Sequence, residues 1–209
     1  MDKKIVITIA RGYGSGGKSI GQLLSKELGI PFYDREILYM ASDDSGINVG
    51  LFQKNDEEVN IGLFDSSTKP YQGNIIPPED SKFTSKENLF NYQAKIIKSL
   101  AEKESCIIVG RCADYVLKDF ENIIKVFIWA PHDVCINTVM DMFAMNEKEA
   151  DKRINKIDKH RSEFYYYYTG RDWDNARNYD LCLNSADLGF DGCVEAIKAY
   201  IEVLNNVKK

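Results

Sequence analysis

The chain has 209 residues, 44% of them hydrophobic, and a formal net charge of −5 at pH 7. This length suits one domain with a sizeable core, and the acidic balance disfavours a nucleic-acid-binding surface, which needs a face rich in lysine and arginine. No apolar run approaches the roughly 20 residues of a membrane span, so we expect a cytoplasmic protein with no membrane partner. The five cysteines form no C-x-x-C pair, which favours reduced thiols over disulfides or a thiolate metal site.

A glycine-rich segment follows the first apolar run. Residues 5–10 are mostly β-branched and predict a strand; Gly12 to Ser19 then match G-x-x-x-x-G-K-S, before an amphipathic helix that ends at Gly29. Glycines allow positive φ and carry no Cβ, so consecutive backbone N–H groups can surround a phosphate. Lys18 would reach the outer phosphates, and the Ser19 hydroxyl could ligate Mg²⁺. The pattern predicts an ATP site made of Gly12, Gly14, Ser15, Gly16, Gly17, Lys18, Ser19 and Ile20.

The second apolar segment, Phe32 to Leu38, ends in charge and passes into a helix. Asp34 falls at the carboxyl end of this short strand, and open α/β sheets bind their ligands at that edge. Three roles stay open for Asp34: holding an acceptor hydroxyl, assisting Mg²⁺ through water, or capping the following helix.

Residues 43–83 are polar and irregular, and Pro77-Pro78 close the segment. A connection this long inside a compact domain is usually a functional insertion or a disordered stretch. We interpret it as a small acceptor-binding subdomain with a helix near Leu51 to Val59. A plain surface loop stays open as the alternative.

The next segment predicts a helix followed by a buried strand. Thr84 and Glu87 fit a capping box, and the helix they begin should end near Lys103. The continuously apolar run 106–109 is typical of a parallel strand covered on both faces, and it leads to Arg111. The Arg111 guanidinium would therefore emerge at the ligand edge, where it could bind phosphate oxygens or form an ordinary salt bridge.

Two more strands complete the expected sheet. Residues 123–130 predict a clear central strand, and the helix over 133–142 should bury Val134, Val139 and Met142. Residues 179–184 predict the last strand, with a loop over 185–188 and a final helix. Five strands alternating with helices predict an α/β protein, a three-layer α/β/α fold with a five-stranded parallel sheet.

Residues 147–177 reverse the local sign of charge, because eight lysines and arginines, Arg153 and Arg161 among them, gather in an otherwise acidic chain. A solvated helix face is the usual explanation. After a phosphate loop we favour a lid whose cations close over the transferred phosphoryl group. The run Tyr165 to Tyr168 is expected to pack this helix on the body. The expected organisation is one domain, 1–209, with a core of 1–42, 84–146 and 178–209, an acceptor-binding insertion at 43–83 and a lid at 147–177.

Several segments together resemble the cytidylate kinase-like family of bacterial P-loop kinases: Gly12 to Ser19, Ile30 to Asp34, Val109 to Tyr115, Asp158 to Arg161, and Tyr179 to Asn184. They span nearly the whole chain. The resemblance implies a nucleoside monophosphate kinase fold that uses ATP and Mg²⁺. It assigns Lys18 and the loop to the ATP phosphates, Ser19 to Mg²⁺ and Arg111 to phosphate. It also places Arg153 and Arg161 in the lid and the loop from Asn184 beside the adenine.

The sequence departs from cytidylate kinases at two places. Cys112 stands where those enzymes carry Asp, and Arg35-Glu36 stand where they carry Ser-Gly. The expected activity is phosphoryl transfer from ATP to a small nucleotide, a pyrimidine monophosphate such as CMP or dCMP. The expected catalytic residues are Lys18, Asp34, Arg111, Arg153 and Arg161. Phe32-Tyr33-Asp34 is also similar to shikimate-type kinases, so a hydroxyl acceptor stays open, as does a nucleotide-binding sensor without transferase activity.

Overall fold

The computed structural model of the protein describes residues 4–57 and 68–207. A five-stranded parallel sheet of order β2-β3-β1-β4-β5 lies at its centre. The strands are β1 (Val6–Arg11), β2 (Phe32–Tyr33), β3 (Cys106–Val109), β4 (Ile123–Trp129) and β5 (Leu181–Asn184). The predicted α/β class and parallel sheet are therefore confirmed. Within the described residues, no helix is long and apolar enough to cross a bilayer.

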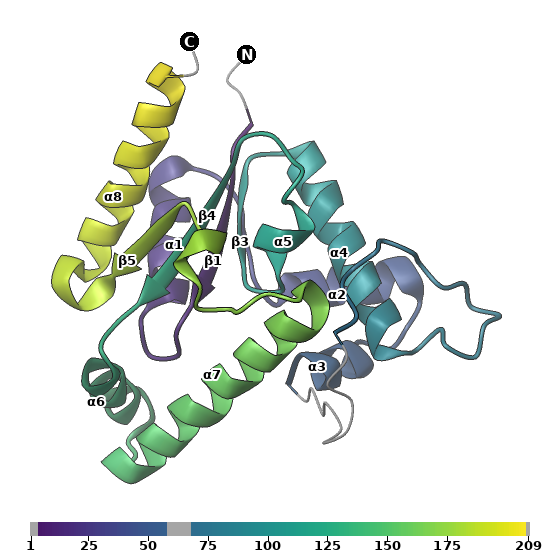
Figure 1. Cartoon of the computed structure of the whole chain (residues 1–209), viewed down its shortest axis with the longest axis horizontal. Helices are drawn as coiled ribbons and strands as arrows, with labels where there is room; N and C mark the ends of the chain where they lie inside the picture. Colours follow the sequence, from purple (N-terminus) through teal and green to yellow (C-terminus); the bar gives the residue numbers. More distant parts are fainter. Residues whose placement is uncertain (1–3, 58–67, 208–209) are drawn as a thin grey trace.

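Helices cover both faces of the sheet (Figure 1). Helices α1 (Gly17–Leu28) and α8 (Ser185–Val207) pack on the face that includes Ile7 and Ile9. Helices α2 (Glu36–Ser45), α4 (Lys86–Lys103) and α5 (Ala113–Val116) pack on the opposite face, which includes Val6. Because successive strand residues point to opposite faces, β1 contributes to both apolar clusters. The central strands β1 and β3 are buried on both sides, as the apolar run 106–109 predicted for β3.

The remaining elements lie near the carboxyl ends of the strands (Figure 1). They are α3 (Val49–Glu57), α6 (His132–Phe143) and α7 (Glu147–Thr169), and the 3₁₀ helix η1 (Ala176–Asn178) precedes β5. Helix α7 crosses this edge of the molecule from α6 towards α3. Helix α3 matches the predicted helix near Leu51, whereas Val59 lies outside the described residues.

The carboxyl-terminal part of α7 packs on the body, as the tyrosine run predicted. Tyr165, Tyr167 and Tyr168 are buried, and Tyr168 stacks on Phe90 of α4 with ring centroids 3.9 Å apart. Tyr166 points to solvent. The α7 backbone also bonds to the insertion, because the N–H groups of residues 69 and 71 donate to the carbonyl oxygens of residues 167 and 168 at 2.9 Å.

Two predicted details of the helices are wrong. The cap of α4 is Ser85, one residue after the predicted Thr84, and its hydroxyl accepts the Asn88 N–H. In α6 Val139 is buried as predicted, together with Cys135, but Val134 is only partly buried and Met142 is 65% exposed. Helix α6 packs on the small apolar cluster that it shares with α7, so a narrower stripe of apolar residues is enough to cover that cluster.

The segment after β5 also differs from the prediction. Residues 185–188 are helical, and α8 is interrupted at Gly189, whose φ of 67° is incompatible with a continuous helix. The Ser185 hydroxyl donates to the Ser15 carbonyl oxygen at 2.7 Å and to that of Trp129 at 3.2 Å. These bonds hold the short first segment of α8 against the glycine-rich loop, which explains why it is ordered.

Candidate phosphate-binding site

The loop between β1 and α1 has the form of an anion nest. Gly14 and Gly16 have φ values of 86° and 76°, and a Cβ on Gly14 would lie 2.9 Å from the Cys135 carbonyl oxygen. Only glycine fits that position without strain. The buried Ser15 hydroxyl donates to the Gly12 carbonyl at 2.8 Å, which fixes the turn. The loop thus ends at the free N–H groups of the α1 amino terminus, where anions bind.

A chain of ion pairs runs from the loop to α3. Lys18 Nζ lies 2.9 Å from one Asp34 oxygen, and Arg111 Nη1 lies 3.2 Å from the other. The second Arg111 nitrogen, Nη2, lies 3.2 Å from Asp56 of α3. The sequence-predicted residues Lys18, Asp34 and Arg111 are therefore in direct contact. Asp34 does not cap α2, because the cap position is Arg35 and no side chain caps the helix there.

The environment of Asp34 keeps its carboxylate charged. Burial alone would raise the pKa of Asp34, but the hydrogen bond from Lys18 and the charges of Arg111 and Arg11 outweigh it and lower the pKa below its usual value. The Arg111 side chain is only 4% exposed. Its Nη1 also donates to the Val109 carbonyl, whereas its Nε has no partner. One side of a buried guanidinium is therefore unsatisfied.

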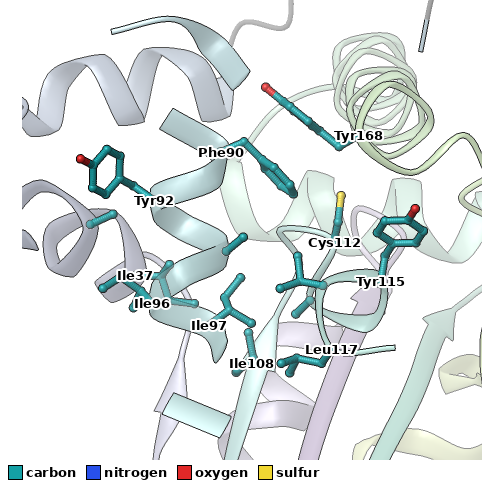
Figure 2. Close-up of a cluster of buried hydrophobic side chains, with 14 of the residues drawn as sticks. Ile37, Phe90, Tyr92, Ile96, Ile97, Ile108, Cys112, Tyr115, Leu117 and Tyr168 are labelled. Atoms are coloured by element: carbon teal, nitrogen blue, oxygen red, sulfur yellow. The ribbon is translucent and has the colours of Figure 1, made fainter. Parts of the chain in front are cut away.

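Cys112, which stands where cytidylate kinases carry Asp, lies in the apolar core and not in the phosphate-binding site. Figure 2 shows the Cys112 side chain among the apolar residues between α4 and α7, with Phe90 and Tyr168 nearby. Burial raises the pKa of this thiol well above its ordinary value, so it stays protonated. Asp114 is also buried, and it accepts the Tyr165 hydroxyl at 2.6 Å. The carboxylates beside Arg111 come instead from Asp34 and Asp56, which are distant in sequence.

Helix α7 contacts the glycine-rich loop through three charged residues. Both Asp158 oxygens accept the Tyr13 N–H, at 2.9 and 3.1 Å, and Arg161 Nη1 donates to Asp158 and to the Arg11 carbonyl. Arg153 Nε donates to the Tyr13 hydroxyl at 2.8 Å. The two predicted arginines of α7 thus converge on the loop, with Tyr13 between them.

Three residues near the loop were not singled out as site residues from the sequence: Arg11, Asp56 and Asp158. Arg11 carried a signal, because it is a cation at the carboxyl end of the central strand. Asp158 precedes Arg161 by three residues, a spacing that places both on one helix face. Asp56 lies in a polar stretch with several acidic residues, and nothing local distinguishes it from its neighbours.

The opposite side of the loop faces β5 and α8. Asn184 Nδ2 donates to Asp187 at 2.8 Å, and its Oδ1 accepts the Ala186 N–H, so this side chain bonds to the first turn of α8. The Phe190 ring packs against Gly16: a Cβ on Gly16 would lie 2.3 Å from the nearest atom of that ring. Ile20 is fully buried, and its N–H bonds to the Gly16 carbonyl. Ile20 therefore supports the loop from the core, and its assignment to the nucleotide site stays a prediction.

The donor set suits a magnesium ion carried by a nucleotide. Mg²⁺ keeps several waters and usually takes only one or two protein oxygens in addition to phosphate oxygens. The exposed Ser19 hydroxyl in the first turn of α1 can supply one such oxygen. Among the described residues no group of three or more His, Cys, Asp or Glu side chains could hold a metal alone. The residues fit Mg²⁺ bound with phosphates.

This sheet order, with a glycine-rich loop between its central strand and α1, defines a P-loop fold of the nucleoside monophosphate kinase type. A profile of the cytidylate kinase-like family matches residues 6–187, and the chain belongs to that family.

The chain is similar to known proteins over almost its whole length. It is 24% identical over 203 residues to a cytidylate kinase from Archaeoglobus fulgidus, covering 94% of each chain. It is similar to a structure of an uncharacterized protein from Eubacterium ventriosum, with a TM-score of 0.69, 27% identity and coverage of 95% and 99% of the two chains. Shikimate kinase from Bacteroides thetaiotaomicron has a TM-score of 0.54 at 14% identity, with coverage of 95% and 98%, which shows a shared fold.

Proposed function

We propose that this protein transfers the γ-phosphoryl group of ATP to a pyrimidine nucleoside monophosphate such as CMP or dCMP. The observation that carries the proposal is the position of Asp34 between Lys18 and Arg111. One carboxylate thereby holds the lysine of the glycine-rich loop beside a buried arginine that lies just after β3. Family membership and the cytidylate kinase from Archaeoglobus fulgidus support the same reaction.

Each part of the site has a role in this reaction. The loop N–H groups and Lys18 bind the β- and γ-phosphates, and the first turn of α8, after Asn184, borders the adenine. Mg²⁺, ligated through Ser19, would neutralise charge on the phosphate oxygens. Helix α7 is the lid that brings Arg153 and Arg161, and residues 43–83 bind the acceptor. Because the transition state of phosphoryl transfer is loose, positioning and fixed positive charge provide the catalysis.

The state of Asp34 favours a phosphate acceptor over a hydroxyl acceptor. A phosphate oxygen needs no strong base, whereas a hydroxyl must lose its proton during the transfer. Both Asp34 oxygens are engaged by cations, and its pKa is lowered, which makes it a weak base. Asp34 therefore positions Lys18 and Arg111 in this mechanism.

A coupled ADP-release assay tests the proposal directly. The acceptors are CMP, dCMP, UMP, AMP, GMP and shikimate, each with Mg·ATP. We expect turnover with the pyrimidine monophosphates and a loss of about 10²–10³ in kcat for Lys18→Ala, by analogy with deletion of a preorganised donor. Lys26→Ala, an exposed change on the same helix, should leave kcat unchanged. Wild-type turnover by Lys18→Ala would refute the assignment.

A hydroxyl kinase is the second candidate, because Asp34 lies at the carboxyl end of β2 within 2.9 Å of Lys18. Under that mechanism Asp34→Asn should abolish turnover and leave ATP affinity nearly intact. Under the monophosphate mechanism the same change should raise the acceptor KM more than it lowers kcat. ATP binding with no turnover across the whole panel would instead indicate a nucleotide-binding sensor.

A further inference from the structure

The Arg11 side chain occupies a space that two glycines leave open. A Cβ on Gly17 would lie 2.5 Å from Arg11 Cβ, and a Cβ on Gly110 would lie 2.5 Å from Arg11 Nη1. The stem of Arg11 thus crosses the start of α1, and its guanidinium reaches the end of β3. Gly17 and Gly110, about 90 residues apart in sequence, both lack a side chain where Arg11 passes. The surrounding chain therefore leaves a specific space for the Arg11 side chain.

The Arg11 guanidinium has no hydrogen-bond acceptor in residues 4–57 and 68–207, although the arginines around it do. Arg111 donates to Asp34, Asp56 and a backbone carbonyl, and Arg161 donates to Asp158 and a backbone carbonyl. Arg11 is partly buried, and none of its nitrogens is among the fully buried unpaired atoms, so water can reach the guanidinium and a ligand could replace that water. Arg11 is therefore an accessible cation with no hydrogen-bonded anion in the described part of the chain.

The charged groups around Arg11 also indicate that negative charge is lacking near its guanidinium. Burial and the nearby positive charge of Arg161 lower the pKa of Arg11 to about 9, and Asp34 and Asp56 only partly offset them. The positive charge of Arg111, just after β3, also lowers the pKa of Arg11. An anion beside the Arg11 guanidinium would offset this surplus of positive charge.

We propose that the Arg11 guanidinium binds the phosphate group of the acceptor. This inference rests on the proposed function, because it assigns a residue to the acceptor of that reaction. Guanidinium groups suit phosphate because their planar N–H groups match its oxygens. The N–H groups of the loop and α1 serve the ATP phosphates. The Arg11 guanidinium instead lies against Gly110, on the β3 side where Asp34 and Arg111 meet.

A binding experiment tests this role without turnover. The nucleotide site is filled with Mg²⁺ and a non-hydrolysable ATP analogue, and inorganic phosphate is then titrated by calorimetry. We expect Arg11→Met to weaken phosphate binding about 10–100-fold, as the loss of charge-assisted hydrogen bonds predicts, with Arg11→Lys intermediate. Affinity for the ATP analogue should change by less than about threefold. The matched control is Arg177→Met, an exposed arginine on η1, which should change neither affinity.

The inference would be overturned if Arg11→Met bound phosphate as tightly as the wild-type protein, or if the wild-type protein bound no phosphate under these conditions. It would also be overturned if Arg11→Met lost affinity for the ATP analogue as much as for phosphate, because that result would assign Arg11 to ATP. Circular dichroism confirms that each variant is folded, and Arg11→Lys keeps the test valid if Arg11→Met does not fold. If the wild-type protein turns over no acceptor, the proposed function fails, and the phosphate titration still decides the role of Arg11. With an active enzyme, Arg11→Met should raise the KM for CMP and leave the KM for ATP unchanged.

Discussion

Replacing Asp34 with Asn should destabilise the protein because it leaves a buried arginine with fewer anionic partners. Asp34 holds Lys18 and Arg111, and the Arg111 side chain is 4% exposed. The amide keeps the shape of the carboxylate but carries no charge. The substitution therefore isolates the electrostatic part of the interaction.

The magnitude follows from what remains around Arg111. Removing one partner of a buried ion pair typically lowers the free energy of unfolding by about 3–5 kcal/mol. Asp56 and the Val109 carbonyl still accept from Arg111, so we expect a smaller loss of about 2–4 kcal/mol. For a chain of this length that corresponds to a fall of roughly 5–15 °C in Tm. The lowered pKa of Asp34 also means that its charge stabilises the fold above pH 3.8 and that this contribution disappears as the pH falls further.

Urea unfolding followed by circular dichroism measures the loss, and Asp44→Asn is the matched control. Asp44 pairs with Lys95 at 2.7 Å, but both side chains are much more exposed, so its loss should be below about 1 kcal/mol. The difference between wild type and Asp34→Asn should shrink below pH 3.8. Equal losses for the two variants, or a difference that does not depend on pH, would refute the reasoning.

Three further changes test other parts of the structure. The pKa of Glu87 is lowered to about 2, because its hydrogen bonds to Lys69 and Tyr167 outweigh its burial, so its charge should stabilise the fold fully above about pH 4.5. Glu87→Gln should cost about 1 kcal/mol at pH 7 and progressively less as the pH falls towards 2, measured by urea unfolding. Gly110→Ala should lower Tm and weaken phosphate binding, because φ is 74° and the new Cβ would meet Arg11; an unchanged Tm would contradict the close approach. Tyr168→Ala should cost about 3–5 kcal/mol, whereas Tyr166→Ala, on the exposed face, should cost less than about 0.5 kcal/mol.

The fold could be predicted from sequence because its signals are local. The strand at 5–10, the helix ending at Gly29 and the apolar runs at 106–109 and 123–130 each contain their own pattern and boundary residues. Alternating strands and helices leave few topologies besides a parallel sheet with right-handed crossovers. The errors lie at positions where a tertiary contact decides the outcome. The start of α8, for example, is helical where its Ser185 binds the loop.

The site could be predicted only in part, because its partners are distant in sequence. Lys18 and Arg111 were found from a motif and from the end of a strand. The carboxylate of Asp56 reaches Arg111 from 55 residues away, and no periodicity indicates that contact. Arg11 could have been found by asking which cation follows the central strand. Its lack of a partner appears only when three separate segments are assembled.

Helix α7 should couple the glycine-rich loop to residues 68–83, because one continuous helix contacts both. Asp158 and Arg161 in its middle bond to the glycine-rich loop, and the carbonyl groups at its end accept N–H groups of the insertion (Figure 1). A helix transmits displacement along its axis, so a phosphate that repositions Arg161 should also act on the backbone bonds of Lys69 and Tyr71. We expect an ATP analogue with Mg²⁺ to slow amide hydrogen exchange at these two residues, which mass spectrometry can measure. Asp158→Asn should reduce this protection while the control Asp44→Asn keeps it. Unchanged exchange at Lys69 and Tyr71 in the wild-type complex would show that the loop and the insertion respond independently.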